Sequence, residues 1–570
     1  ASNNTAVGHV ALSANTTGIS NVAVGSQALD ANTTADNNTA VGKDALGVNT
    51  TGANNVALGT YALDANTTAG SNVAVGVYAL SANTTAANNT AVGNRALFVN
   101  TTGTQNVAVG ANALDANTTA NNNVACGMNS LTANTTGANN TGFGHRTLAD
   151  NTTGTQNVAV GANALDANTT ANYNTAIGDN SLTTNTTGAN NTAVGQSSLY
   201  ANTTASNNTA FGYDALYANT TGDNNVAVGV SALDANTTGA TNVAVGNSSL
   251  TANTTGIRLT GLGHGALGSN TTGTRNTGVG YAALNGNTTG QYNVAVGNST
   301  MVTNTTGAKN TALGGFALQA NTTANNNTAL GYAALFPNTT GSDNVAVGAE
   351  VLSSNTTGAS NVGVGKDALV LNTTGAQNTA LGSNALRRVT TGSNNTCVGY
   401  KSGQYINTTG HENTIIGSLA GDSLTTGVNN ACIGYDSEPS SSTANNSITL
   451  GNNAISSLRC NQTSISSLSD QRDKTDIIDL PIGLDFINKV RPVKFKWASR
   501  DGKQGKDGTY EAGFIAQEFQ AVESSTSVDY LRLVLDDNPD KLEATPNKLF
   551  PVLVKAIQEL SAKVTALEAG

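Results

Sequence analysis

The sequence predicts a mainly β protein, in which a β-solenoid (β-roll) shaft is followed by a small α+β domain that ends in a coiled-coil helix. Three observations lead to this fold class. A glycine recurs every 17 residues from Gly8 to Gly399. Charged residues form 11% and aromatic residues 4% of the 570 residues, too few for ordinary globular domains. Beyond Gly451 the composition changes abruptly, and the single tryptophan, Trp497, lies there.

The repeat unit reads N-[VT]-A-[VLIF]-G-x-x-A-L-x-x-N-T-T-[GA]-x-x. After a slip of one residue the glycine column resumes at Gly417, Gly434 and Gly451, which gives 27 turns in all. A period of 17 is too short for helix–turn–helix repeats, and a glycine with two threonines in every period disfavours helices. The unit therefore predicts one short strand and several corners per turn.

The second turn shows where each part of the unit is expected to lie. Residues 22–24, Val-Ala-Val, form a short strand, and Gly25 forms a corner. Ala28 and Leu29 form a second buried point, and residues 32–34, Asn-Thr-Thr, form a return edge. The Gly25 column has no exceptions, which indicates a backbone with positive φ or a close backbone approach.

Asparagine and threonine recur at fixed positions of the unit. Stacked coils place identical residues above one another, so we expect these side chains to form hydrogen-bonded ladders along the solenoid axis. Asn-Thr-Thr is also formally a glycosylation sequon, and the sequence leaves that alternative open. The strand at residues 22–24 is apolar on both faces, which predicts a strand between the coil interior and a neighbouring chain. We therefore expect a homo-oligomer.

Composition and charge exclude several classes of protein. Four cysteines in 570 residues do not make a disulfide framework, and no run approaches the ~18 apolar residues of a membrane span. The net charge of −10 disfavours a surface for nucleic acid. No metal site and no cofactor site is expected, because the histidines of the repeat occupy variable, exposed positions.

The chain divides into three parts. Residues 1–451 are the expected shaft, residues 452–469 a connector, and residues 470–570 the α+β domain. In this last domain we expect a short helix at 483–490, a strand at 492–497, and a buried strand or strand–helix junction at 513–519. From Leu553 to Leu567 apolar residues alternate at spacings of four and three, which is a coiled-coil seam and needs partner chains. Ile or Val at one core position with Leu at the other favours a coiled coil of two helices.

Residues 469–570 contain four motifs in a fixed order: Ser469-Asp470-Gln471-Arg472-Asp473-Lys474, GLDFINKVRPVKFKW at 483–497, GFIAQE at 513–518 and LFPVLVKAIQELSAKVTALE at 549–568. This part resembles the intramolecular chaperone auto-processing domain that ends phage tailspikes and tail fibres, endosialidase among them. The resemblance implies a trimeric chaperone that assembles the upstream fibre and then cuts itself off beside the serine of S-D-x-R-x-K. The repeat is similar to the turns of trimeric autotransporter adhesin heads, which form left-handed β-rolls.

Self-cleavage needs a nucleophile and a base within reach of each other. All four histidines, the last being His411, precede this domain, so a Ser-His-Asp triad within it is excluded unless a histidine of the shaft reaches it. A serine can instead be activated by a lysine whose neutral form is favoured by desolvation. Ser469 and Lys474 are the candidates, and the resemblance implies the same Ser-Lys dyad. Without the resemblance, the motif is a polar loop at a helix start with Ser469 as the N-cap.

The expected scissile bond is Ser469–Asp470, with Leu468–Ser469 as the second choice. Arg472 is expected to orient Asp470 or another carboxylate of this domain. Glu518 is expected to hold Lys474.

These inferences predict a trimeric viral tail fibre or spike for host attachment, located in the virion and outside the cell. Its expected partners are two further copies of the chain, tail or baseplate proteins, and a host cell-surface receptor such as a glycan or an outer-membrane component. Binding of nucleic acid and insertion into membranes are not expected. The only enzymatic act is intramolecular autoproteolysis, without an external substrate. The alternative is a bacterial or other cell-surface adhesin or filament, with ice binding as an option, that uses the same chaperone.

Overall fold

The computed structural model describes residues 1–455, 457–459, 469–498, 510–536 and 542–570. The chain forms two compact units, Ala1–Asn344 and Val345–Gly570. The expected connector, residues 452–469, includes 456 and 460–468, which lie outside the described residues.

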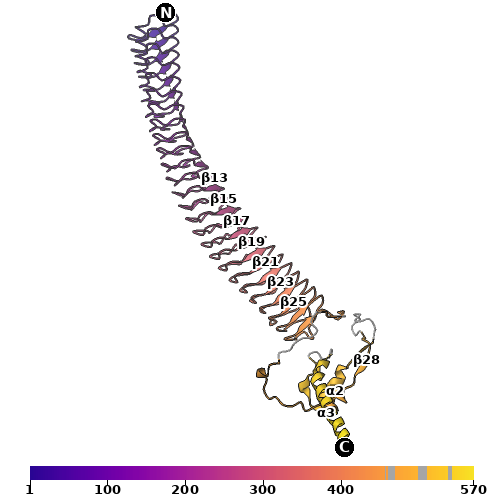
Figure 1. Ribbon diagram of the computed structural model, residues 1–570. Helices are drawn as coiled ribbons and strands as arrows, with labels where there is room; N and C mark the ends of the chain where they lie inside the picture. The colour runs from indigo at the N-terminus through magenta and orange to yellow at the C-terminus, as the bar shows by residue number, and fades with distance from the viewer. Residues whose placement is uncertain (456, 460–468, 499–509, 537–541) are drawn as a thin grey trace. The chain divides into compact units, whose positions relative to one another are not determined.

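The first unit is a β-solenoid whose twenty strands have three residues each. Each strand pairs in parallel with the next in a register of 17 residues, as in Thr5 with Val22 (Figure 1). The strands are β1 Thr5–Val7, β2 Val22–Val24, β3 Thr39–Val41, β4 Val56–Leu58, β5 Val73–Val75, β6 Thr90–Val92, β7 Val107–Val109, β8 Val124–Cys126, β9 Thr141–Phe143, β10 Val158–Val160, β11 Thr175–Ile177, β12 Thr192–Val194, β13 Thr209–Phe211, β14 Val226–Val228, β15 Val243–Val245, β16 Thr260–Leu262, β17 Thr277–Val279, β18 Val294–Val296, β19 Thr311–Leu313 and β20 Thr328–Leu330.

The second unit begins with seven more strands of the same kind, again paired in parallel from β21 to β27. They confirm the predicted mainly β solenoid with a repeat of 17 residues. The strands are β21 Val345–Val347, β22 Val362–Val364, β23 Thr379–Leu381, β24 Thr396–Val398, β25 Thr414–Ile416, β26 Ala431–Ile433 and β27 Ile448–Leu450.

Each turn buries one side of its strand and one corner. In β2 the Ala23 side chain is fully buried, whereas Val22 and Val24 are only partly covered. Ala28 and Leu29, the predicted second buried point, are also fully buried. The predicted return edge at residues 32–34 contains a buried Asn32 but forms a bend instead of a strand.

The invariant glycines meet both conditions that the sequence predicted. Gly25 has a φ of +137°, and a Cβ atom there would lie 2.4 Å from the carbonyl oxygen of Gly42. The structure adds a feature that the sequence did not reveal. Three other positions of the turn, represented by Gln27, Leu29 and Asn37, have φ values between 54° and 61°. A leucine rarely adopts this region, so the surrounding contacts must enforce it.

Two buried asparagine ladders join successive turns, as predicted. In the first, the Asn38 backbone N–H donates to Asn21 Oδ1 at 2.9 Å. In the second, Asn49 Nδ2 donates to Asn32 Oδ1 at 3.2 Å. A threonine ladder runs beside the second, with Thr33 Oγ1 donating to the Thr50 carbonyl at 3.2 Å.

The asparagines of Asn-Thr-Thr are fully buried in every turn from Asn32 to Asn372. A glycan on such a side chain would have to replace an amide hydrogen that the ladder uses. The structure therefore favours the ladder over glycosylation as the reason for the motif.

The rest of the second unit is a small α+β region. Among the described residues, β28 pairs antiparallel with β29, β30 pairs with β31, and three α-helices surround a small core (Figure 1). The core residues are Phe486, Phe519, Val528, Leu531, Leu533, Leu549 and Val552. The elements are η1 Gln471–Asp473, α1 Leu484–Ile487, β28 Val493–Phe495, β29 Glu511–Gly513, α2 Ala516–Thr526, η2 Asp529–Leu531, β30 Val534–Leu535, β31 Glu543–Ala544, η3 Pro546–Leu549 and α3 Phe550–Ala569.

The elements expected in this region are present. Helix α1 lies within 483–490, strand β28 within 492–497, and the 513–519 segment is the junction from β29 to α2. Helix α3 carries the predicted seam, and its side chains are exposed, for example 66% at Ile557 and 81% at Leu567.

Candidate self-cleavage site

The candidate site lies on the short segment that begins at Ser469. The helix η1 follows directly, and Asp470 is its N-cap, because Asp470 Oδ1 accepts the Arg472 backbone N–H at 2.9 Å. The sequence had offered Ser469 as the cap, and that reading is wrong. The Asp470 cap leaves the Ser469 hydroxyl free for another partner.

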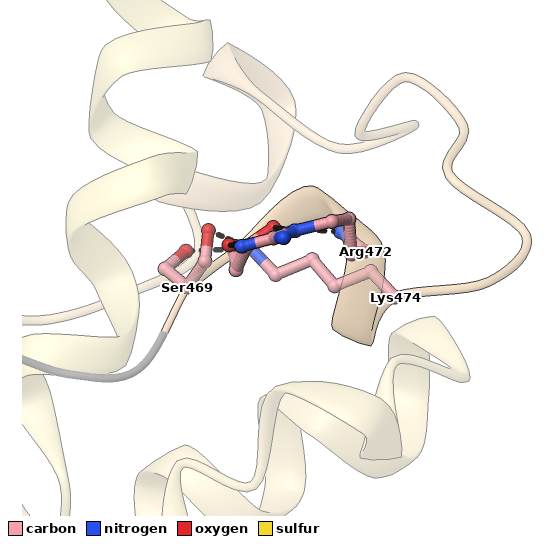
Figure 2. A network of polar contacts seen from close by, with 4 residues as sticks. Ser469, Arg472 and Lys474 are labelled. Carbon is pink, nitrogen blue, oxygen red and sulfur yellow. Dashed lines mark hydrogen bonds and ion pairs between the residues drawn. The ribbon is translucent and has the colours of Figure 1, made fainter.

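The chain brings Ser469 and Lys474 together across this helical turn. Lys474 Nζ lies 2.5 Å from Ser469 Oγ and 3.4 Å from the Ser469 carbonyl oxygen. Figure 2 shows the Lys474 side chain reaching back along η1 toward Ser469. Both residues are exposed in the single chain. The geometry is that of a serine hydroxyl beside an amine that can exchange a proton with it.

Arg472 pairs with Asp470, the residue that follows the candidate nucleophile. Its Nε lies 3.0 Å from Asp470 Oδ1, and its second terminal nitrogen lies 2.6 Å from Oδ2. The Arg472 guanidinium thereby holds the pKa of the Asp470 carboxyl below its usual value. This fork holds the Asp470 side chain next to the Ser469–Asp470 peptide bond, and a role of Arg472 in cleavage stays a prediction.

Glu518 lies elsewhere than expected. Among the described contacts it forms an ion pair with Arg491, whose Nε lies 3.0 Å from Glu518 Oε2, and not with Lys474. The pair holds the pKa of Glu518 below its usual value, mainly through the hydrogen bond from Arg491. Both residues lie in the quoted motifs, but no spacing or residue pattern in those motifs pairs them. Leu468, a partner in the second candidate bond, lies outside the described residues.

A shallow groove adjoins Lys474, and the sequence analysis did not anticipate it. It has a volume of about 540 Å³ and is lined by residues 474–481 and Tyr530. Ile477 and Ile478 lie on it with 62% and 82% of their surface exposed. The two adjacent isoleucines, a few residues after the candidate base Lys474, are the sequence feature that could have predicted this groove.

The described residues contain neither a cluster of metal ligands nor a membrane-spanning helix. No group of three or more His, Cys, Asp or Glu side chains there is placed to hold a metal ion. None of the helices described is both long enough and apolar enough to span a bilayer.

Comparison with known protein families identifies the segment that holds the dyad. Residues 469–528 match the family described as the chaperone of endosialidase. The match begins at Ser469 and agrees with the resemblance seen in the sequence motifs. A repeat shaft followed by this chaperone fits a trimeric fibre assembled by an intramolecular chaperone. No curated protein matches the chain.

Proposed function

We propose that the chain is one subunit of a trimeric fibre that the C-terminal chaperone assembles and then leaves by cutting the chain beside Ser469. The observation that carries this proposal is the 2.5 Å approach of Lys474 Nζ to Ser469 Oγ, at the first residue of the chaperone match. The fibre is a viral tail fibre or spike that attaches to a host cell, and the cleavage is its only enzymatic act.

The outward face of the solenoid strands supports an oligomer. In β1 to β27 the third residue of each strand points away from the coil interior and is Val, Leu, Ile, Phe or Cys, without a polar exception in the described solenoid. Phe143 and Phe211 are 59% and 49% exposed in the single chain. A water-facing apolar column of this length is rare in a monomer. A partner that matches a 17-residue period along its whole length is another copy of the same chain.

Helix α3 supports the same conclusion in the chaperone. Its apolar seam, which includes Ile557, Leu560 and Val564, is exposed by 45% to 66% in the single chain. Such a seam is stable only when helices from other chains cover it. The rule for core positions favours two helices, whereas the chaperone match favours three, and we give the match more weight because the seam spans barely two heptads.

Assembly also supplies what the dyad lacks in a single chain. A lysine takes the proton of a serine only where desolvation favours the neutral amine. Ser469 and Lys474 are exposed here, and the apolar groove with Ile477 and Ile478 lies beside them. A second copy that covers this groove would remove water from Lys474. Cleavage would then follow trimer formation instead of preceding it.

The chemistry distinguishes the two candidate bonds. Ser469 Oγ attacks a carbonyl carbon, its proton passes to Lys474 Nζ, and the leaving amine takes that proton before water hydrolyses the resulting ester. Attack on the Leu468 carbonyl passes through a five-membered ring, whereas attack by Ser469 on its own carbonyl requires a strained four-membered ring. If the Ser469–Asp470 bond is cut, the attacking Ser469 therefore belongs to another copy, or water attacks directly. The released fragment begins at Ser469 if the Leu468–Ser469 bond is cut, and at Asp470 if the Ser469–Asp470 bond is cut.

Removal of the chaperone has a physical use for a fibre. A long parallel solenoid folds slowly because its contacts form only after distant turns meet, so a template that fixes chain number and register speeds assembly. Once the template is gone, the fibre cannot easily unfold and refold, and its stability becomes kinetic. Such a particle suits an extracellular attachment device that binds a host glycan or outer-membrane component and is held by tail or baseplate proteins.

The second candidate function is a cell-surface adhesin or filament that uses the same chaperone. Its support is the similarity of the repeat to adhesin-head turns. Genes for tail or baseplate proteins beside this gene would favour the virion. Loss of binding to a defined host strain when the fibre is deleted would favour it further.

The experiment compares the full chain with its Ser469→Ala and Lys474→Ala variants by denaturing gel and intact mass spectrometry. The wild type should lose its 101 or 102 C-terminal residues, depending on which bond is cut. Both variants should keep full length. Wild-type chains that keep full length while forming trimers would disprove the cleavage but leave the chaperone role intact.

A further inference from the structure

The last turns of the solenoid differ from the others in what fills the second asparagine column. From Asn32 to Asn372 this column holds a fully buried asparagine in every turn. The next three positions hold Val389, Ile406 and Leu424, which are also fully buried. One of the two polar ladders therefore stops before the end of the solenoid, and an apolar column replaces it.

The exchange leaves an acceptor without a donor. Asn372 Nδ2 donates to Asn355 Oδ1 at 2.8 Å, as ladder asparagines do throughout. Asn372 Oδ1 is buried and has no hydrogen-bond partner, because Val389 cannot donate to it. An unsatisfied buried acceptor costs about 1–3 kcal/mol. Because the end of the ladder at Asn372 costs free energy, we expect an interaction in the apolar turns that follow to offset it.

The interior of these turns is also rearranged. The leucine column ends at Leu386, and Gly403 and Gly421 take the next two positions. The strand centres that hold Ala or Gly in the earlier turns hold Cys397, Ile415 and Cys432, all fully buried, and Thr449 in the last strand. Apolar volume has thus moved to the side where the second ladder ran. Turns built in this way bury more apolar surface and keep only one asparagine ladder, that of Asn395, Asn413 and Asn430, instead of two.

The remaining asparagine ladder has a direction. Asn225 Oδ1 accepts the Asn242 backbone N–H at 3.0 Å, and Asn225 Nδ2 donates to the Gly239 carbonyl at 2.9 Å. Both partners belong to the next turn toward the C-terminus. A folded stack therefore presents fixed backbone groups at its N-terminal face, onto which the asparagine of the preceding turn can dock. Docking on fixed groups loses less conformational entropy than docking on a mobile side chain.

We propose that residues 386–451 are the folding nucleus of the solenoid, and that the ladder turns then add to it one after another toward the N-terminus. Identical repeats can nucleate anywhere, so a preferred nucleus needs turns that differ from the rest. These turns are the ones nearest the chaperone in the sequence. The inference goes beyond the proposed cleavage and does not depend on its chemistry.

The test follows the order in which the turns fold. The full Ser469→Ala chain, which keeps its chaperone, is refolded from denaturant and pulse-labelled by hydrogen exchange, and its peptides are read by mass spectrometry. Protection should appear first in peptides from 386–451, later in those around 200–260, and last near the N-terminus. Protection that begins at the N-terminus, or arises everywhere at one rate, would overturn the proposal.

A matched pair of variants separates a nucleus from a simple end cap. Leu424→Asn places a polar side chain in the apolar column and should slow protection of the whole solenoid about tenfold. Asn236→Leu makes the reverse exchange in the middle of the ladder and should leave the rate at 386–451 unchanged. Equal slowing by both variants, or no slowing by Leu424→Asn, would contradict a nucleus at this place. If Leu424→Asn does not fold, the order of protection in the parent chain still decides the question. Failure of cleavage in the wild type is read separately on the denaturing gel.

Discussion

The solenoid and the C-terminal α+β region fill their interiors with different chemistry. Solenoid turns bury small and medium residues, such as Ala23 and Leu29, together with two asparagines whose amides bond to neighbouring turns. The C-terminal region instead packs large apolar side chains around Phe486 and Phe519. The solenoid is thus held by interactions that exist only between turns, and a fault in one turn also damages the next.

The two regions share one property. Each leaves an apolar column exposed in the single chain, the third strand position in the solenoid and the seam of α3 in the chaperone. Regions with unlike interiors thus share an exposed apolar outer face, and the proposed oligomer rests on this shared feature. Because a fault in one turn also damages the next, substitutions in the solenoid should change stability by more than substitutions in the C-terminal region do.

The largest effect is expected at an invariant glycine. Gly212 has a φ of +138°, and a Cβ there would lie 2.5 Å from the Gly229 carbonyl oxygen. Gly212→Ala should therefore destabilise the solenoid by more than about 3 kcal/mol, measured by thermal or denaturant unfolding. Gly222→Ala is the control: a Cβ there would lie 2.2 Å from the Gly239 carbonyl oxygen, but that column has no positive φ and holds alanine in other turns, such as Ala205. Its cost should stay below about 1 kcal/mol. Equal losses would show that close approach alone, without φ, makes glycine necessary.

The next effect is expected in the second ladder. Asn236 Nδ2 donates to Asn219 Oδ1 at 2.8 Å and to the Gly239 carbonyl at 2.9 Å, and its Oδ1 accepts from Asn253 at 2.8 Å. Asn236→Ala removes all three bonds and leaves buried partners unsatisfied, which should cost about 2–4 kcal/mol. Native-state hydrogen exchange of peptides covering 219–256 measures this loss. An unchanged opening free energy there would mean that the ladder does not stabilise the fold.

A gap in the first ladder, at Leu259, offers the opposite change. Leu259 stands where neighbouring turns carry asparagine, and it cannot accept a hydrogen bond from the Asn276 backbone. In the next turn the Asn293 backbone N–H donates to Asn276 Oδ1 at 2.9 Å. Leu259→Asn should stabilise these turns by about 0.5–1.5 kcal/mol in the same exchange measurement. A loss of stability would show that Leu259 fills apolar space that an amide cannot.

A pH effect is expected near the end of the solenoid. The Glu438 carboxylate accepts the backbone N–H groups of Asp422 and Ser423 at 3.0 and 3.1 Å. Burial raises the pKa of Glu438 from 4.5 to about 7, so the folded state holds its proton more tightly than the unfolded state. The last turns should therefore lose stability as the pH rises from about 4.5 to about 7. Glu438→Gln should flatten this dependence in hydrogen exchange of residues 417–451, and a dependence that persists in the variant would assign it to another group.

The smallest effects belong to the chaperone. Glu559 on α3 accepts the Leu484 backbone N–H at the start of α1 at 2.8 Å, so Glu559→Ala should cost about 1 kcal/mol. Arg491→Ala breaks an exposed ion pair with Glu518 and should cost at most about 0.5 kcal/mol. Denaturant unfolding of the Ser469→Ala chain measures both. A larger loss for Arg491→Ala than for Glu559→Ala would show that the exposed ion pair stabilises this region more than the hydrogen bond from Leu484 to Glu559.

The repeat made the solenoid readable in advance. Comparison of the 27 turns shows which positions of the unit tolerate change and which do not. The strand, the glycine corner and both ladders followed from these columns. The left-handed conformation of Leu29 did not, because the contacts that enforce it come from neighbouring turns and leave no mark in the residue type.

The candidate site was readable for a different reason. Ser469 and Lys474 lie five residues apart, so one helical turn is enough to bring them together, and a motif can reveal such local geometry. The Arg491–Glu518 pair joins residues 27 positions apart across the fold, and only the packing of α2 against its neighbours fixes it. The apolar groove beside Lys474 is lined mostly by the consecutive residues 474–481, so only the contribution of Tyr530 depends on long-range packing.

The measurement that tests the central claim most directly is the native mass of the full Ser469→Ala chain in solution. Both exposed columns are then present in one uncut particle. We expect three chains per particle, with no free subunit at micromolar concentration. A particle with the mass of one folded chain would contradict it, because the apolar faces of the strands and of α3 would then be stable in water without a partner.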